Sequence, residues 1–306
     1  MTQASFPLRL GTRGSPLALV QAHMVAAALR AAHGWAEDAV TIVTVKTTGD
    51  RVQDRPLAEI GGKALWTKEL DRALLDGAID FAVHSMKDVE TIRPPTIRIA
   101  AMLPRADVRD RLVGAESVAA LPQDARVGTS SPRRAAQLRH LRPDIAIVPF
   151  RGNVDTRLRK LAEGEAEATL LAAAGLDRLD RLDVGHAVPV ETMLPAPAQG
   201  AVGIEARTDD DAMLALLRAI NDADTHACVL AERAFLAALG ADCHSPVGAL
   251  AVRAGGGVMI RAELLSEDGR HRVAGIIEAP GDLAGTLADR LLAEAPPEIA
   301  RLFTGR

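Results

Sequence analysis

An ammonium and a carboxylate lie side by side in the pentapeptide HSMKD at residues 84–88, directly after the apolar run DFAV. The run predicts a strand, and open α/β sheets bind their ligands at the carboxyl ends of strands. Lys87 and Asp88 are therefore candidates for proton transfer and for stabilising charge that develops during a reaction. The alternative is an ordinary surface ion pair, which contributes little energy.

Arginines form a second candidate group between residues 125 and 160, where nine Lys or Arg stand against two Asp. Eight of these nine are arginine, whose planar guanidinium makes paired hydrogen bonds to carboxylates and phosphates. Arg133 and Arg134 fall in the first turn of a predicted helix, where a cation opposes the helix dipole and a bound anion would offset the cost. The pattern predicts a polyanion site, and a solvated helix face is the alternative.

The two cysteines differ in their surroundings. Cys243 lies in the loop GADCHSPVG, whose small residues leave the sulfur accessible, whereas Cys228 lies on an apolar helical stripe. A buried thiol usually acts as a small hydrophobic group, but an accessible thiol beside His244 is a candidate ligand, nucleophile or attachment point. A cysteine hydrolase would also need a base and an oxyanion hole, and the sequence has no clear signature of either.

A short motif occurs twice, as GTRGSP at residues 11–16 and as GTSSP at residues 128–132. Each copy follows an apolar run, opens a predicted helix and has a glutamine six residues after its last serine, at Gln21 and Gln137. Serine suits the N-cap and proline the first helical position, so the N–H groups of both turns are available to anions. The repetition predicts two similar domains.

Composition argues against several classes of function. Aromatic residues make up 2% of the chain and the formal net charge is −4, so neither a nucleic acid nor a membrane surface is an expected partner. Two cysteines without a CxxC spacing predict no zinc site, and no metal is expected. The lack of a signal-like or membrane-spanning apolar segment predicts a cytoplasmic protein. The sequence also has no GxxxxGK[ST], HExxH or GxSxG motif.

Short apolar runs alternate with Ala/Leu-rich stretches of helical period, which predicts an α/β fold. We expect two similar, doubly wound, periplasmic-binding-protein-like domains with largely parallel sheets, and a small C-terminal α+β domain with an antiparallel sheet. Domain 1 comprises residues 1–102 and 200–218, domain 2 comprises residues 103–199, and domain 3 comprises residues 219–306.

A resemblance to a known family rests on a series of segments that span roughly residues 8–250: GTRGSPLALVQA, TTGDR, IGGKALWTKELDRALLDGAIDFAVHSMKDV, VGTSSPRRAAQL, FRGNVDTRL, LAAAGLDRL, PAQGAVGIE and CHSPVG. In this order they resemble the porphobilinogen deaminases. The resemblance implies a transferase, a hydroxymethylbilane synthase, that condenses four porphobilinogen molecules head to tail with loss of ammonia. Hydrolysis then releases hydroxymethylbilane for the biosynthesis of haem and other tetrapyrroles.

The same resemblance implies a dipyrromethane cofactor, bound covalently through a thioether to Cys243, that primes the condensation. Asp88, with Lys87 beside it, is the implied catalytic carboxylate. Porphobilinogen is the implied small-molecule partner, and a monomer is expected. Because each pyrrole carries an acetate and a propionate, a loaded enzyme holds about a dozen carboxylates, which the arginine excess would balance.

The resemblance also implies the polar residues that bind these groups. Toward the cofactor they are Cys243, Lys63, Ser85, Asp88, Thr129, Ser130, Ser131, Arg133, Arg134 and Gly152. Toward the substrate they are Arg13, Ser15, Gln21, Arg151, Arg157, Arg178 and Gln199, the last at the return crossing of the chain into domain 1. Two positions depart from the family pattern: Glu59, where a lysine is common, and GAD in place of GG before the cysteine.

Two other functions are candidates. A two-lobed anion-binding module of the periplasmic-binding-protein type would share the expected fold, but it would not need Asp88 or Cys243. A thiol-dependent hydrolase would need the base that the sequence does not provide.

The contrast between the two cysteines gives a direct test. Cys243→Ser is expected to yield folded protein without covalent adduct and without activity, because the attachment atom is gone. Cys228→Ser is expected to stay active, because its thiol only fills space in a helical stripe. Intact-mass measurement of both variants checks this, and an adduct lost from the Cys228 variant but kept in the Cys243 variant would contradict the assignment.

Overall fold

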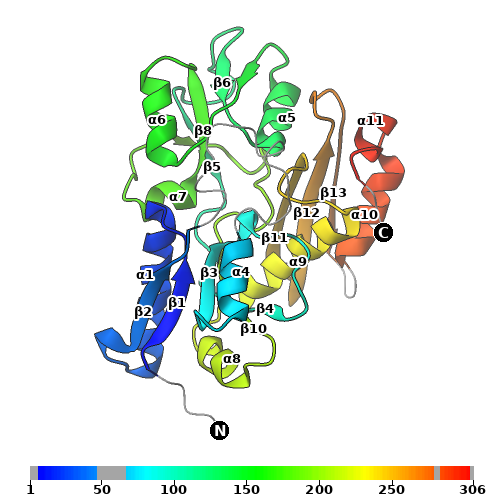
Figure 1. Ribbon diagram of the computed structural model, residues 1–306. Coiled ribbons are helices and arrows are strands. Elements are labelled where there is room, and N and C mark those ends of the chain that lie inside the picture. The colour runs from blue at the N-terminus through cyan, green and yellow to red at the C-terminus, as the bar shows by residue number, and fades with distance from the viewer. Residues whose placement is uncertain (1–5, 47–66, 279–282, 304–306) are drawn as a thin grey trace. The chain divides into compact units, whose positions relative to one another are not determined.

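The computed structural model describes residues 6–46, 67–278 and 283–303, and these contain three separate sheets (Figure 1). Internal contacts divide the chain into two compact units: unit 1 is Met1–Ala106 with Ala201–His226, and unit 2 is Asp107–Gly200 with Ala227–Arg306. The predicted α/β class is confirmed. The predicted division into three domains stays a prediction. Within the described residues no helix is long and apolar enough to cross a membrane.

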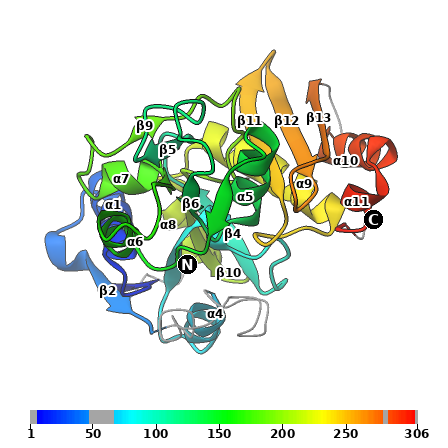
Figure 2. The same ribbon diagram turned by 90° about the horizontal axis from the view of Figure 1, so that it is seen from above.

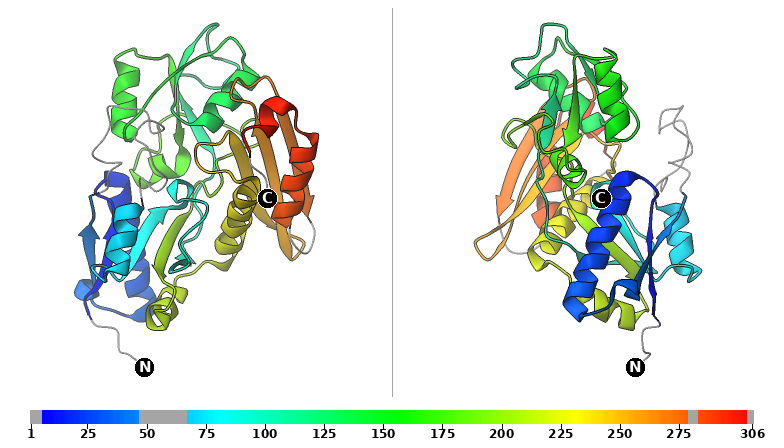
Figure 3. Two further views of the ribbon diagram at one scale, coloured as in Figure 1. Left: turned by 45° about the vertical axis from the view of Figure 1, so that its right-hand side comes forward. Right: turned by 90° about the vertical axis from the view of Figure 1, so that its left-hand side faces the viewer.

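Unit 1 contains one five-stranded sheet with helices on both faces. Its elements are β1 (Leu8–Thr12), α1 (Pro16–His33), a 3₁₀ turn (Glu37–Ala39), β2 (Val40–Thr44), α4 (Lys68–Leu75), β3 (Phe81–Ser85), a 3₁₀ turn (Met86–Asp88), β4 (Ile97–Met102), β10 (Val202–Arg207) and α8 (Asp211–Arg218). The strand order is β2-β1-β3-β10-β4. Phe81 and Val83 pack with α1 and α8, whereas Ala82, on the opposite face of β3, packs with α4. Helices α1 and α4 accordingly lie on opposite sides of the sheet (Figure 3).

Unit 2 contains a second five-stranded sheet, in the order β7-β6-β8-β5-β9. Its elements are β5 (Asp110–Val113), β6 (Arg126–Gly128), α5 (Pro132–Leu141), β7 (Ala146–Val148), α6 (Val154–Ala162), β8 (Ala168–Ala172), α7 (Ala173–Arg178) and β9 (His186–Ala187). Helices α5 and α6 flank this sheet on opposite sides (Figures 1 and 2).

The two five-stranded sheets share one topology. In each, three neighbouring strands are parallel and the fourth strand, β10 or β5, is antiparallel to both of its neighbours. The prediction of two similar lobes with largely parallel sheets is therefore confirmed, since four of the five strands in each sheet run in the same direction. The exceptions have a common cause: β5 and β10 each follow a point where the chain passes from one unit to the other.

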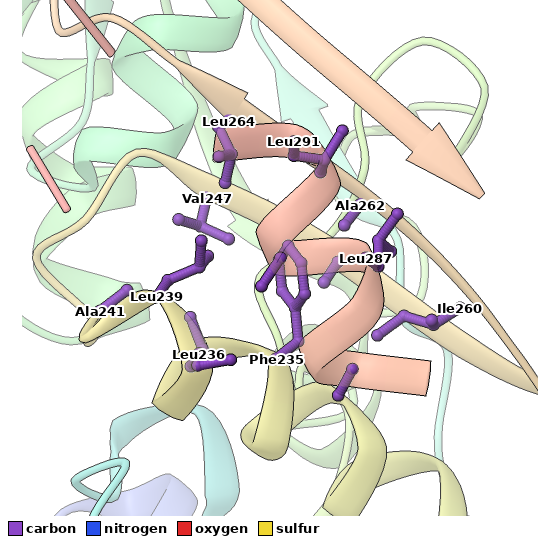
Figure 4. Close-up of a cluster of buried hydrophobic side chains, with 14 of the residues drawn as sticks. Phe235, Leu236, Leu239, Ala241, Val247, Ile260, Ala262, Leu264, Leu287 and Leu291 are labelled. Atoms are coloured by element: carbon purple, nitrogen blue, oxygen red, sulfur yellow. The ribbon is translucent and has the colours of Figure 1, made fainter. Parts of the chain in front are cut away.

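The predicted antiparallel sheet at the C-terminal end of the chain is confirmed. Its elements are α9 (Ala223–Leu239), β11 (Val247–Ala254), β12 (Gly257–Leu265), β13 (Arg272–Glu278), α10 (Leu283–Glu294) and α11 (Pro297–Ala300). Phe235 of α9 is fully buried and packs with Ile260 of β12 and with Leu287 of α10 (Figure 4). Gly255 and Gly256 have positive φ angles of 51° and 80°, which permits the tight turn between β11 and β12.

Beneath the strand that carries the HSMKD motif, unit 1 contains a buried charge cluster around Arg93. Its guanidinium donates to both carboxylate oxygens of Glu205 at 2.8 Å and to Glu90 at 2.8 Å, and it also pairs with Asp71. His84 Nε2 lies 3.3 Å from Glu205 Oε2. Burial alone would raise the pKa of Glu205, but hydrogen bonds and charge from His84 and Arg93 outweigh it and lower the pKa to about 2.

Glu205 is therefore expected to couple stability to pH. Because its pKa falls on folding, its ionised form stabilises the fold above the unfolded-state pKa, and this contribution disappears as the pH falls from about 4.5 toward 2. Glu205→Gln should lower the free energy of unfolding at pH 7 by about 3 kcal/mol and flatten its acid dependence. Urea unfolding at pH 7 and pH 4 measures both effects.

Glu167→Gln is the matched control, because Glu167 pairs with Arg126 on the exposed surface at 2.7 Å. This substitution should lower the free energy of unfolding by less than about 1 kcal/mol. Equal losses in the two variants at pH 7, or an unchanged acid slope in Glu205→Gln, would contradict the role assigned to the buried carboxylate.

Candidate functional site

The predicted catalytic pair lies where the sequence places it, at the carboxyl end of β3. The strand ends at Ser85, and the chain turns at once into the 3₁₀ turn that carries Lys87 and the half-buried Asp88. Met86, the first residue of this turn, is buried, and its N–H donates to the carbonyl of Ala201 at 3.1 Å. The backbone of the turn that carries Asp88 is thus anchored to the residue that precedes β10.

The predicted binding residues at the first motif of unit 1 divide into a helix cap and a buried support. Ser15 caps α1 and accepts a hydrogen bond from the N–H of Ala18, as predicted. Gln21 is buried on the first turns of α1, and its amide exchanges hydrogen bonds of 2.8 and 3.1 Å with the hydroxyl of Ser85. Gln21 therefore holds Ser85 at the strand end. Arg13, in the loop before the cap, is half-buried.

The equivalent motif of unit 2 opens α5. Ser131 caps the helix and accepts from the N–H of Arg134, which confirms the predicted N-cap. Thr129 is buried, and its hydroxyl accepts from the N–H of Ser131 at 3.1 Å, while the exposed Ser130 donates to the carbonyl of Phe150 at 2.9 Å. The loop before α5 is thus held by its own side chains.

Arg133 and Arg134 share a buried counterion within the chain. Both side chains are buried. Arg133 Nη2 lies 2.9 Å from Asp110 Oδ2, and Arg134 Nη2 lies 2.7 Å from Asp110 Oδ1. Burial would raise the pKa of Asp110, but the two guanidiniums hold it far below its usual value. Asp110 is therefore an anion from within the fold that offsets these two cations at the start of α5.

The remaining members of the arginine cluster separate into two groups. Four of them form ion pairs with Asp or Glu at or near the surface, and only the last two of these lie on a helix, α6: Arg126, Arg142, Arg159 and Lys160. Arg139 donates to the carbonyl of Glu267. Arg151 is different, because its Nη1 is buried without a hydrogen-bond partner in the described part of the chain.

The RGN turn before α6 holds Arg151 and Arg157 together. Gly152 has φ +105°, and a Cβ there would lie 2.6 Å from a methyl carbon of Thr156, so only glycine suits this position. Its carbonyl accepts from Arg157 Nε at 3.0 Å, and Asn153 caps the helix. The turn thereby fixes two of the predicted substrate-binding arginines.

Arg178 and Gln199 anchor the segment just before the chain returns to unit 1: Arg178 bonds to this segment, and Gln199 lies in it. Arg178 Nη2 donates to the carbonyl of Gly200 at 2.7 Å, and burial lowers the pKa of its guanidinium. Gln199 is buried, and its Nε2 donates to Asp110 Oδ1 at 2.9 Å and to the carbonyl of Val108. The unit boundary falls between Gly200 and Ala201, inside the segment predicted for the return crossing.

The structure confirms the contrast between the two cysteines: Cys243 is exposed and Cys228 is buried. The side chain of Asp242, the residue that departs from the family pattern, accepts from the N–H of His244 at 2.8 Å, and Ser245 Oγ accepts from the N–H of Asp242 at 3.2 Å. These bonds close the loop around Cys243. Lys63 and Glu59 lie outside the described residues.

Unit 2 suits an anionic group attached through Cys243. Besides Arg151 Nη1, the Nε atoms of Arg133, Arg134 and Arg178 are buried and have no hydrogen-bond partner among the described residues. Each such donor costs free energy until it is satisfied, and a ligand carboxylate satisfies it. No group of His, Cys, Asp or Glu within the described ranges is arranged to hold a metal.

Sequence reasoning missed the carboxylates that position these arginines. Asp110 begins the strand sequence DRLV, and Glu263 interrupts the apolar end of β12. Both are buried. A carboxylate inside an otherwise apolar strand was the available signal, because a buried charge requires a partner.

These features define a class: an α/β protein of two similar sheets, with helix N-termini and buried guanidiniums that suit anionic ligands and with one accessible thiol. Residues 8–215 match the family model described as porphobilinogen deaminase, dipyromethane cofactor binding domain, and residues 226–293 match its C-terminal domain. The chain belongs to the porphobilinogen deaminase family, a family of enzymes that bind a dipyrromethane cofactor.

Two curated porphobilinogen deaminases are similar in sequence to this chain over nearly its full length. A porphobilinogen deaminase of Sphingopyxis alaskensis is 60% identical over 97% of this chain and 96% of its own length. One of Paracoccus denitrificans is 52% identical over 95% of this chain and 96% of its own length.

Solved structures show more distant similarity. YhfZ from Shigella flexneri has 18% identity and a TM-score of 0.36, covering 74% of this chain and 93% of its own. A periplasmic sulfonate-binding protein from Methylobacillus flagellatus has 16% identity and a TM-score of 0.39, covering 76% of this chain and 68% of its own.

Gly203 on β10 is expected to be a positioning residue for the turn that carries Asp88. A Cβ at this position would collide with the sulfur of buried Met86 and lie 2.7 Å from its Cγ. Gly203→Ala should displace the turn and lower kcat about 100-fold, while intact mass still shows the covalent adduct. Steady-state kinetics and mass spectrometry of one preparation measure both.

Gly257→Ala is the matched control, because the nearest atom to a Cβ at Gly257 is 3.8 Å away. The double variant Gly203→Ala/Met86→Ala removes the collision and should recover part of the lost kcat. A Gly203→Ala enzyme with wild-type kcat, or a double variant no better than the single one, would contradict the role of Gly203.

Proposed function

We propose that the chain is a transferase, a hydroxymethylbilane synthase that joins four porphobilinogen molecules head to tail on a dipyrromethane primer, with loss of ammonia, and then releases hydroxymethylbilane by hydrolysis for haem biosynthesis. The observation that carries the proposal is the exposed thiol of Cys243 in a unit whose buried guanidiniums include N–H groups with no acceptor in the part of the chain that the structure describes. The proposal includes a monomeric state and a cytoplasmic location, and size-exclusion chromatography tests the first of these.

The residues of unit 2 would hold the cofactor. Cys243 Sγ would form the thioether, and the first turn of α5 with Arg133 and Arg134 would bind carboxylates of the primer. When bound, the dipyrromethane supplies a nucleophilic pyrrole carbon. Arg151, Arg157 and Arg178 would bind the acetate and propionate groups of substrate pyrroles, since paired guanidinium–carboxylate bonds are strong and directional.

In unit 1, Asp88 would act on the substrate itself. As the C–N bond of the aminomethyl group breaks and ammonia leaves, positive charge develops on the pyrrole. The Asp88 carboxylate would stabilise that charge and mediate the proton transfer that accompanies it. Lys87, the adjacent residue, would bind a substrate carboxylate. The position at a strand end, fixed by Met86 and the sheet, suits a group that must not move during the reaction.

Intact mass separates this enzyme from an anion-binding module. The purified wild-type chain should carry an excess mass equal to two pyrrole units, and Cys243→Ser should carry none. A wild-type chain of unmodified mass that still binds porphobilinogen reversibly would favour the binding module instead.

Asp88 variants test the catalytic assignment. Asp88→Ala should fold and keep the adduct, yet lose about 1000-fold in kcat, because it removes stabilisation that exists only in the transition state. Asp88→Glu should retain a trace of activity. Rapid-quench measurement of ammonia release and of enzyme-bound pyrroles identifies the slowed step. Normal deamination with only product release slowed would overturn the assignment.

A further inference from the structure

A chain of buried polar side chains connects the C-terminal sheet to the arginines at the start of α5. Helix α5 contacts strand β12 (Figure 2). At this contact Gln137 of α5 donates from Nε2 to Glu263 Oε1 at 2.5 Å, and its Oε1 accepts from Arg133 Nη1 at 2.9 Å. Gln137, Glu263 and Arg133 are all buried. The amide therefore transmits the position of the carboxylate to the guanidinium.

The carbonyl of Leu194 fixes the same group from a second direction. It accepts from Arg133 Nη1 and from Gln137 Nε2, both at 2.8 Å. Gly248 lies opposite Glu263 in the sheet, and a Cβ there would lie 2.9 Å from Leu194 Cβ and 3.0 Å from Glu263 Oε1. Because Gly248 has no side chain, Leu194 and Glu263 both have room to bond to Gln137.

The charges in this network do not balance around Asp110. Arg133 and Arg134 share that one carboxylate, so these three side chains together carry one surplus positive charge. Glu263 is the second carboxylate near Arg133, and its other oxygen accepts from Arg272 Nε at 2.6 Å, on a side chain that is 39% exposed. Burial and the neighbouring Arg134 lower the pKa of Arg133, and Asp110 and Glu263 oppose this. Glu263 thus favours the charged guanidinium in the absence of ligand.

We propose that Gln137 and Glu263 are positioning residues of the anion site: through them the C-terminal sheet orients the Arg133 guanidinium, so that its charge and its Nε, which has no hydrogen-bond partner among the described residues, are ready for a carboxylate of the cofactor. The inference rests on the proposed function and deepens it. The C-terminal sheet then has a role in cofactor capture that is separate from carrying Cys243.

The test uses the fraction of purified chains that carry the covalent adduct, measured by intact mass. Glu263→Gln keeps an amide for Gln137 to bond but removes the charge, so it should lower the loaded-to-unloaded ratio about tenfold. Its melting temperature should stay within about 4 °C of wild type, because the partner Arg272 can turn to solvent. A loaded ratio equal to that of wild type would overturn the proposal.

A swapped double variant separates orientation of Arg133 from general damage. The double variant Gln137→Glu/Glu263→Gln moves the carboxylate from position 263 to position 137, where it lies next to Arg133. It also keeps an amide–carboxylate hydrogen bond between α5 and β12. It should recover the loaded ratio that Glu263→Gln loses. Equal losses in both variants would show that the pair serves only the fold.

Arg272→Gln is the control variant, because it removes the exposed partner of Glu263 and leaves the contacts of Gln137 intact. Its loaded ratio should match wild type, and a tenfold fall would contradict the proposal. Failure of the proposed function would look different, since the wild-type chain itself would then carry no adduct.

Discussion

One buried carboxylate, Asp110, determines how unit 2 can hold positive charge. Two guanidiniums at the first turn of α5 and the amide of Gln199 all bond to it. A cation at a helix N-terminus opposes the helix dipole, and a buried cation also loses its hydration, so neither arginine could stay in place without a counterion. Asp110 provides that counterion on the crossing strand β5, and the rest of the anion site depends on it.

The two lobes use the same motif to different ends. In both, a serine caps a helix and a glutamine six residues later is buried. Gln21 bonds to Ser85 and so supports the strand end that carries Asp88, whereas Gln137 bonds to Arg133 and supports the anion site. A repeated helix start thus supports the turn that carries Asp88 in one lobe and the guanidinium of Arg133 in the other.

Periodicity and turn residues predicted most of the local structure. The strand that precedes the HSMKD motif and the helix caps at Ser15 and Ser131 depend on nearby residues, and the structure has them as expected. The sequence could not show that β5 and β10 run antiparallel, because a strand's direction depends on a crossing between lobes. Nor could it pair Arg133 with Asp110, 23 positions away, because partners of buried charges are chosen by tertiary packing.

Stability alone does not account for the buried arginines of unit 2. In unit 1, Arg93 has a surplus of acceptors, with three carboxylates around one guanidinium, as expected of a purely structural ion cluster. In unit 2 the balance is reversed, because Arg133 and Arg134 share the carboxylate of Asp110 and each has a buried Nε for which the described residues provide no acceptor. Apolar side chains of similar volume would usually destabilise the folded state less than buried cations whose N–H groups are unsatisfied. A surplus of donors in the unit that bears the exposed thiol of Cys243 is what a covalently attached polycarboxylate requires.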